Sequence, residues 1–169
     1  FFGNEFFDAI PIKQFKREEK ILYEKFYFLQ KNYKIKELFK KASKKDIQNI
    51  NSYNSLNELK FIEFPKTGFI ELKKMIRKIS NLRGCILLID YGYLKSKNQN
   101  TLQSVFKHKK NSVLRNLGKA DITSHINFNL LDEFFLKNGL KIKKTVTQRE
   151  FLQSLGINKR AEIISKKKI

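Results

Sequence analysis

The order of apolar and polar residues in the first quarter of the chain predicts three β-strands. Residues 12–16 alternate between apolar and polar, as a half-buried strand does. Residues 21–29 and 33–39 are rich in aromatic and β-branched side chains, and short polar connections separate the three runs. Such spacing is typical of an antiparallel meander. The next stretch, 40–60, is rich in polar residues with a weak helical pattern at 46–50, so we expect a surface excursion there.

The middle of the chain predicts a helix followed by a buried strand. Phe69, Leu72, Ile76 and Ile79 recur at helical spacing, which places them on one face of a helix. Residues 85–89 are then apolar at every position, a pattern that indicates a strand covered on both faces by helices. A helix that leads into such a strand is half of a βαβ crossover, and the sequence therefore predicts an α/β fold.

The last third continues this alternation of strands and helices. Residues 101–106, 121–126 and 140–146 are expected to be extended, whereas a helix begins after Asn127 or Asn129. Its inward residues are expected to be Phe128, Leu131, Phe134 and Phe135, with Gly139 at its end. Thr147 and Glu150 have the spacing of a capping box, which predicts a helix ending at Gly156; a final helix from about Asn158 runs into the lysine-rich tail.

Polar side chains follow two of these strands directly. Asn4, Glu5 and Asp8 come after the apolar start of the chain, and Asp90 and Tyr91 follow the buried strand. If the two strands are parallel neighbours, these side chains share one rim of the sheet, where ligands bind in open α/β folds. Carboxylates there would hold a cationic group such as a guanidinium through charge-assisted bonds. A surface turn with two solvated acids explains Glu5 and Asp8 equally well.

A third group of polar residues, Asp121, Thr123 and His125, lies on the predicted extended stretch near residue 121. For His125, a structural hydrogen bond is favoured over catalysis. The sequence has neither His/Cys zinc spacing nor a G-x-S-x-G nucleophile motif, so we expect neither a metal site nor a serine nucleophile. The one cysteine, Cys85, is expected to be a core thiol.

The chain is strongly basic, because 36 Lys and Arg residues face 16 Asp and Glu residues, a net charge of +20. Such a field favours anionic partners, namely nucleic acid, acidic lipid or an acidic protein. The lysines are spread along the chain without an RNA-binding signature, so a solvated surface is the simpler interpretation and nucleic acid is not the expected partner. No apolar run approaches the roughly 20 residues that a membrane-spanning helix needs.

Five motifs, in order, resemble the MidA-like methyltransferases. Residues 4–11 are similar to the N-E-F-F-D-A-L-P segment of that family, with Ile10 in place of Leu, and residues 90–92 match its D-Y-G strand end. The other three are residues 101–108 (T-L-x-x-V with a following His), residues 120–128 (A-D-I-T-x-H-I-x-F) and residues 147–157 (T-Q-x-x-F-L with L-G-I). These motifs cover nearly the whole chain.

The resemblance implies an S-adenosylmethionine-dependent enzyme that methylates a protein arginine, with a core subunit of respiratory complex I as the substrate. It implies Glu5 and Asp8 as catalytic carboxylates and Asn4 as a cofactor contact. Asp90, Tyr91, Asp121 and His125 would form the substrate-binding rim, the last two as bracing residues. The implied location is the cytoplasm in a bacterium and the mitochondrial matrix in a eukaryote.

The implied fold is the C-terminal portion of a class I, Rossmann-like, seven-stranded methyltransferase domain with an antiparallel β insertion. We expect residues 1–169 to belong to one N-terminally truncated domain, with 12–60 as the insertion. The first three strands and the glycine-rich cofactor loop would precede Phe1, and no G-x-G-x-x-G occurs in this sequence. The absence of this loop leaves both outcomes open for the chain alone, binding of S-adenosylmethionine or none. Two alternatives remain: a non-catalytic basic module that binds nucleic acid or an acidic assembly partner, and a truncated product without activity.

Overall fold

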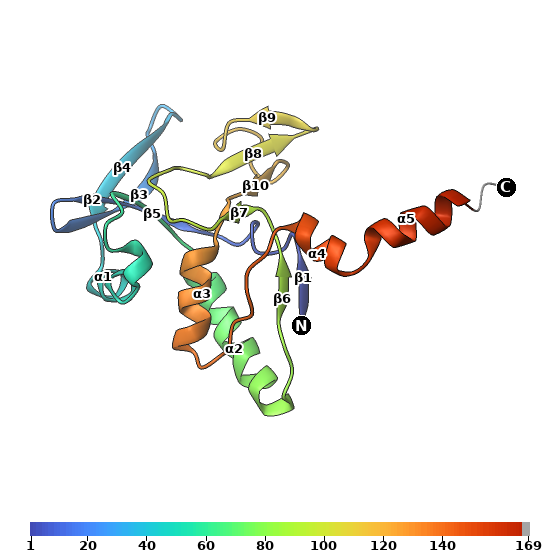
Figure 1. Cartoon of the computed structure of the whole chain (residues 1–169). Helices are drawn as coiled ribbons and strands as arrows, with labels where there is room; N and C mark the ends of the chain where they lie inside the picture. Colours follow the sequence, from blue (N-terminus) through green and yellow to red (C-terminus); the bar gives the residue numbers. More distant parts are fainter. Residues whose placement is uncertain (167–169) are drawn as a thin grey trace.

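The computed structural model describes residues 1–166, which form a mixed α/β structure (Figure 1). Strand β1 (Phe2–Asn4) pairs in parallel with β6 (Leu87–Ile89), with Gly3 opposite Leu88. A long connection that contains a sheet and three helices joins the two strands, so residues more than 80 positions apart become neighbours. The structure thereby confirms that the two predicted strand ends lie at the same edge.

A four-stranded antiparallel sheet follows β1, with the order β4-β3-β2-β5. Its strands are β2 (Lys13–Glu18), β3 (Ile21–Leu29), β4 (Ile35–Lys41) and β5 (Phe61–Phe64). The predicted alternation holds for Phe15, which is fully buried, and Lys16, which is exposed, but not for Gln14, a polar residue that is also buried. The predicted meander is confirmed as β2-β3-β4, and β5 closes its other side.

The polar stretch 40–60 contributes to the core, which corrects the prediction of a surface excursion. It forms α1 (Lys44–Asn51) and the short 3₁₀ helix η1 (Asn54–Leu56). Ile50 and Leu56 are almost fully buried in spite of their polar surroundings in the sequence. Asp46 is buried as well, and its carboxylate lies 3.1 Å from the Lys13 ammonium and 2.6 Å from that of Lys66. Burial opposes ionisation of Asp46, but hydrogen bonds from the Lys66 ammonium, the Ser43 hydroxyl and the Lys13 ammonium together hold its pKa below the ordinary value.

Helices α2 (Lys66–Leu82) and α3 (Phe128–Lys137) pack beside each other below the sheets (Figure 1). Phe69 of α2 stacks on Phe134 of α3 with ring centroids 4.1 Å apart, and both rings are buried. The cap of α3 is Asn127, whose side chain accepts a hydrogen bond from the Leu130 N–H. The predicted inward faces of both helices are thus largely confirmed.

Strand β6 is more open than its apolar sequence predicts. Leu87 is 39% exposed, and Cys85 is exposed rather than a core thiol. Among residues 1–166, β1 is the only strand that pairs with β6, so the sequence correctly predicts the strand but not its burial.

Three short strands form a separate antiparallel sheet of order β10-β8-β9, made of β8 (Gln103–Phe106), β9 (Lys109–Asn111) and β10 (Asp121–Thr123). Strand β7 (Gly92–Tyr93) pairs in parallel with β11 (Ile126–Asn127). A Cβ on Gly92 would lie only 2.3 Å from the Ile126 carbonyl oxygen, so this pairing requires glycine at that position.

The C-terminal helices extend away from the rest of the chain (Figure 1). Helix α4 (Gln148–Ser154) begins with the predicted capping box of Thr147 and Glu150, and α5 (Ile157–Lys166) follows it. Residues 140–146 form no strand, which corrects that prediction. The end of the lysine-rich tail lies outside the described residues. Within residues 1–166, no helix combines the length and the apolar character needed to cross a membrane.

Candidate functional site

The candidate site forms where β1 and β6 end. Asn4 pairs with Ile89 in the parallel register, so Glu5 and Asp90 follow at neighbouring positions. The Glu5 N–H donates to the Ile89 carbonyl oxygen at 2.9 Å, which extends the pairing by one bond. Glu5 has a φ of 47°, in the left-handed region that a non-glycine residue seldom adopts. The chain turns sharply at Glu5 and leaves its side chain exposed at the rim of the sheet.

Asp90 anchors the loop that carries the other carboxylates. Its Oδ2 accepts hydrogen bonds from the backbone N–H groups of Phe7 (2.8 Å) and Asp8 (3.2 Å). Its Oδ1 accepts from the N–H of Tyr91 at 2.8 Å. Hydrogen bonds from several backbone N–H groups hold a carboxylate and a loop in one geometry. Asp90 therefore acts on the loop backbone, a task that its position in the sequence does not reveal.

Tyr91 and Glu5 meet at the exposed side of the rim. The Tyr91 hydroxyl donates to Glu5 Oε1 at 3.2 Å, and the tyrosine side chain is exposed to solvent. The hydrogen bond to Glu5, together with its negative charge, raises the pKa of Tyr91 above the ordinary value. Both side chains are therefore accessible from solvent at the rim.

Asp8 lies deeper in the loop, with an unsatisfied oxygen. Its Oδ1 is buried and has no hydrogen-bond partner among the described residues. Burial, and secondarily the nearby charge of Asp90, raise the pKa of Asp8, and Glu5 adds to this effect. The Asp8 carbonyl accepts a hydrogen bond from the Ser124 N–H at 2.9 Å, so the loop is also tied to the β10–β11 connection. A buried carboxylate oxygen without a donor is the feature that a cationic ligand would satisfy.

The substitution Asp8→Asn is expected to stabilise the protein at neutral pH, on the order of 1 kcal/mol, because it removes a poorly compensated charge. Since the pKa of Asp8 is higher in the folded state than in the unfolded one, ionisation costs stability as pH rises through the folded-state pKa. The difference between the variant and the parent should therefore vanish in acid, where Asp8 is protonated in both states. Urea unfolding at several pH values measures it. An Asp8→Asn protein that is less stable than the parent at neutral pH would contradict this account.

The other site residues predicted from the sequence are Asn4, Asp121 and His125, and their surroundings differ. Asn4 is exposed at the end of β1. Asp121 is exposed on β10, opposite Val105. His125 is exposed, and the structure records a hydrogen bond for its backbone, from the N–H to Thr101 Oγ1 at 3.0 Å. The residues brought together are thus Glu5, Asp8, Asp90 and Tyr91.

Glu63 on β5 is a structural residue that the sequence patterns did not single out. Its Oε1 accepts from the N–H groups of Thr101 (3.1 Å) and Leu102 (3.3 Å), and from the Gln14 amide (2.8 Å). Its Oε2 accepts from the Thr101 hydroxyl. Through Thr101, Glu63 holds the segment next to His125, and burial together with the charge of Glu63 raises the pKa of Tyr93 to about 12. A carboxylate in a short β-strand gives no sequence signal for such a role.

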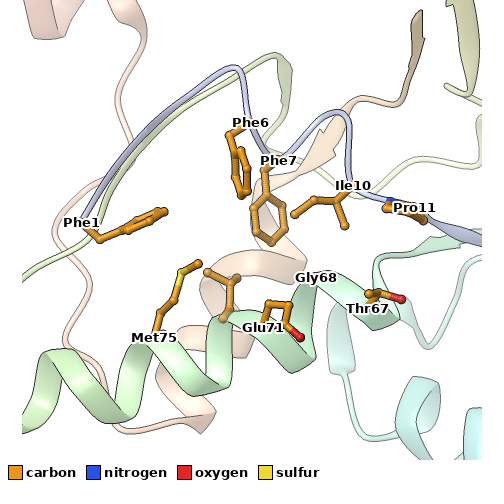
Figure 2. Close-up of a pocket in the computed structure, with 10 residues that line it drawn as sticks. Phe1, Phe6, Phe7, Ile10, Pro11, Thr67, Gly68, Glu71 and Met75 are labelled. Atoms are coloured by element: carbon orange, nitrogen blue, oxygen red, sulfur yellow. The ribbon is translucent and has the colours of Figure 1, made fainter.

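A cavity of about 300 Å³ lies between the loop and α2 (Figure 2). Phe1, Phe6, Phe7 and Ile10 reach into it from the N-terminal segment, and Met75 faces them from α2. Gly68 allows this close approach, since a Cβ there would meet the Ile10 side chain at 2.9 Å. The walls are mostly apolar, so this cavity is unsuited to a guanidinium, and the carboxylates at the strand ends form the polar site. Among residues 1–166, no group of three or more His, Cys, Asp and Glu residues could hold a metal ion.

Known proteins resemble this chain over most of its length. A family model described as "Putative S-adenosyl-L-methionine-dependent methyltransferase" matches residues 1–146. The mitochondrial protein arginine methyltransferase NDUFAF7 homolog of Caenorhabditis elegans is 30% identical over 95% of this chain, and the NDUFAF7 protein of Danio rerio is 25% identical over 97%. The chain spans 38% of the length of each of these relatives.

A solved structure supports the fold. The crystal structure of a superfamily member from Burkholderia thailandensis, bound to S-adenosyl-homocysteine, superposes with a TM-score of 0.73 and 17% sequence identity. The alignment covers 99% of this chain and 44% of that one. The family model covers most of the chain, and the strand-end motifs that it spans are those that converge in space. The chain therefore belongs to the family of MidA-like S-adenosylmethionine-dependent methyltransferases.

Proposed function

We propose that the protein is an S-adenosylmethionine-dependent methyltransferase whose substrate is an arginine side chain of another protein. The observation that carries this proposal is the convergence of Glu5, Asp8 and Asp90 at the carboxyl ends of two parallel strands, with one Asp8 oxygen unsatisfied. A guanidinium presents several N–H donors in a planar fork, which suits carboxylates held at fixed positions. The names of the mitochondrial relatives, which are protein arginine methyltransferases, support the same substrate class.

Each residue of the site has a proposed task. Asn4, exposed at the end of β1, is the candidate contact to the cofactor through its amide. Glu5 receives the guanidinium at the rim, and Asp8 offsets its positive charge from within the loop. Asp90 is a positioning residue, because its carboxylate is engaged by the loop backbone. Tyr91 borders the substrate path, and Asp121 and His125 are left as outer bracing residues.

The chemistry of transfer resides in the cofactor, which supplies an activated methyl group when bound. The tasks left to the residues of this chain are to align the substrate nitrogen, to keep its charge compensated and to restrict water at the rim. The site fits such a cofactor, because an exposed amide and two carboxylates stand at the sheet edge where ligands of α/β folds bind. Negative charge at that edge also favours a sulfonium centre.

The finer architecture is part of the proposal. In it, β1 and β6 are the fourth and fifth strands of a seven-stranded, Rossmann-like sheet, and residues 12–60 are an antiparallel insertion within one domain. The crystal structure with S-adenosyl-homocysteine supports this arrangement through its similar fold. The glycine-rich cofactor loop would lie in the part of the relatives that this chain does not span.

The proposed biological substrate is a core subunit of respiratory complex I, and the proposed location is the mitochondrial matrix in a eukaryote or the cytoplasm in a bacterium. The mitochondrial names of the relatives support the first of these locations.

The full-length protein, incubated with methyl-labelled S-adenosylmethionine and candidate protein substrates, tests the function directly. We expect label in protein that, after acid hydrolysis, is recovered as methylated arginine. Label recovered as methyl-lysine would contradict the substrate class. If no transfer occurs and an oligonucleotide binds with an affinity that falls steeply as salt rises, the non-catalytic basic module is the correct function instead.

A further inference from the structure

The β3–β4 hairpin extends past the sheet to which it belongs. Strand β2 pairs with β3 between Ile21 and Glu24, whereas the pairing of β3 with β4 continues to Leu29 opposite Ile35. Beyond Glu24 the structure is therefore a two-stranded ribbon, which projects at the upper left of Figure 1. A ribbon of this kind gains little stability in water on its own. The residues that the ribbon exposes are therefore better explained by a function than by a contribution to stability.

Both faces of this ribbon carry exposed apolar side chains. Side chains alternate between faces along a strand, so Tyr27, Leu29 and Phe39 share one face while Phe26 and Phe28 share the other. The exposed fractions of Phe28 and Leu29, nearest the turn, are 55% and 59%. A surface that packs against one partner needs only one apolar face. Apolar side chains on both faces suit a medium that surrounds the ribbon.

The turn at the end of the ribbon presents a tyrosine in a costly conformation. Tyr33 has a φ of 60°, in the left-handed region, and its side chain is 86% exposed. The turn is closed by the Gln30 N–H, which donates to the Lys34 carbonyl oxygen at 2.9 Å. Asparagine or glycine would occupy this position with less strain. A strained and exposed aromatic residue is consistent with a role in contacting a partner.

Unpaired positive charge surrounds these apolar side chains. Residues 25–41 contain six lysines and one acid, Glu37, a net charge of +5. The one acid is paired, because Glu37 lies 2.9 Å from the Lys25 ammonium. The other five lysines are exposed and make no ion pair with any residue of 1–166; they are Lys31, Lys34, Lys36, Lys40 and Lys41. A partner that fits this surface therefore has an anionic exterior and an apolar interior.

From these features we propose that the β3–β4 hairpin binds the surface of an anionic phospholipid bilayer, with its turn inserted among the headgroups. Tyrosine and phenylalanine are favoured at the membrane–water interface, and lysines beside them are attracted to acidic headgroups. A bilayer contacts an inserted ribbon on all sides, which accounts for apolar residues on both faces. Single-stranded nucleic acid is less well matched, because it stacks on a one-sided aromatic platform and gains nothing from Leu29 or Ile35.

Binding to phospholipid vesicles tests the proposal with the full-length protein. We expect it to sediment with vesicles of phosphatidylcholine and phosphatidylserine, and much less with phosphatidylcholine alone. The double variant Lys34→Gln/Lys36→Gln should lower vesicle binding by about 25-fold, since each lysine near an anionic surface contributes roughly a factor of five. Lys73→Gln/Lys78→Gln on exposed positions of α2 removes the same charge elsewhere and should lower it far less.

A second variant tests the apolar contribution without risk to the fold. Tyr33→Asn places a residue that tolerates a left-handed φ at the turn, so the hairpin should remain folded or become more stable. Combined with Leu29→Thr, it should lower vesicle binding by about tenfold. Thermal unfolding verifies that both variants are folded.

Three results would overturn the proposal: equal binding to both kinds of vesicle, equal losses in the hairpin and α2 lysine variants, or full binding by the Tyr33→Asn/Leu29→Thr protein. Loss of single-stranded RNA binding in the hairpin variants, without vesicle binding by the parent, would assign the surface to nucleic acid instead.

Discussion

Replacing Glu5 with glutamine in the full-length protein is expected to lower the rate of methyl transfer by at least about 10²-fold. Glutamine retains the size of the side chain and can still accept the hydrogen bond from the Tyr91 hydroxyl. Glutamine lacks the negative charge that, in this proposal, orients the guanidinium and compensates its positive charge at the rim. Because Glu5 acts on the substrate in this proposal, cofactor affinity should remain nearly unchanged.

Measuring cofactor binding by calorimetry and transfer by methyl label separates these two effects. Glu58→Gln is the matched control, because Glu58 is exposed in the loop before β5 and makes no ion pair among residues 1–166. Its rate should equal that of the parent. Unchanged turnover in Glu5→Gln would remove Glu5 from the mechanism, whereas loss of cofactor affinity would move it to the cofactor site.

Local patterns in the sequence predict most of the elements and the shared rim. The alternation around Phe15 identifies β2, and the spacing of Phe69, Leu72 and Ile76 identifies the buried face of α2. The assignment of Asn4 and Ile89 to strand ends rests on the apolar runs before them, and their pairing follows from the tendency of α/β strands to run parallel. Local periodicity and chain topology are sufficient for these features.

Features that depend on distant partners could not be predicted. Residues 140–146 alternate as a strand does, but a strand also needs a neighbour to bond, and none pairs with them among the described residues. Ile50 and Leu56 are buried although polar residues surround them in the sequence, because their helical turns direct these apolar side chains toward the core. Cys85 is exposed although it belongs to an apolar run, because such a run is buried only where other parts of the chain cover it.

Only the structure shows that the carboxylates of the site have different roles. In the sequence, Asp90 and Glu5 are equivalent acids at two strand ends. In the structure, three backbone N–H groups engage Asp90, while the Glu5 carboxylate contacts a single exposed hydroxyl among the described residues. The Asp90 oxygens already accept hydrogen bonds and so hold the loop in place. The Glu5 carboxylate has remaining capacity to accept hydrogen bonds and is therefore available to a ligand.

This division predicts that Asp90→Asn lowers both stability and transfer. The asparagine amide would direct its NH₂ group at backbone N–H donors, either those of Phe7 and Asp8 or that of Tyr91. Donors left without an acceptor cost about 1–3 kcal/mol in the free energy of unfolding. A loop displaced by about 1 Å would lower the transfer rate by on the order of 10²-fold, since the reacting groups would no longer be aligned.

Urea unfolding and single-turnover methyl transfer measure these two consequences separately. Asp90→Glu keeps both acceptor oxygens on a longer side chain, so we expect intermediate stability and an intermediate rate. A substrate-binding role would give a different pattern, in which Asp90→Asn raises the KM for the protein substrate without loss of stability. That outcome would return Asp90 to the substrate rim and leave the Phe7–Asp8 backbone to its other hydrogen bonds, from the N–H groups of Ile10 and Ser124.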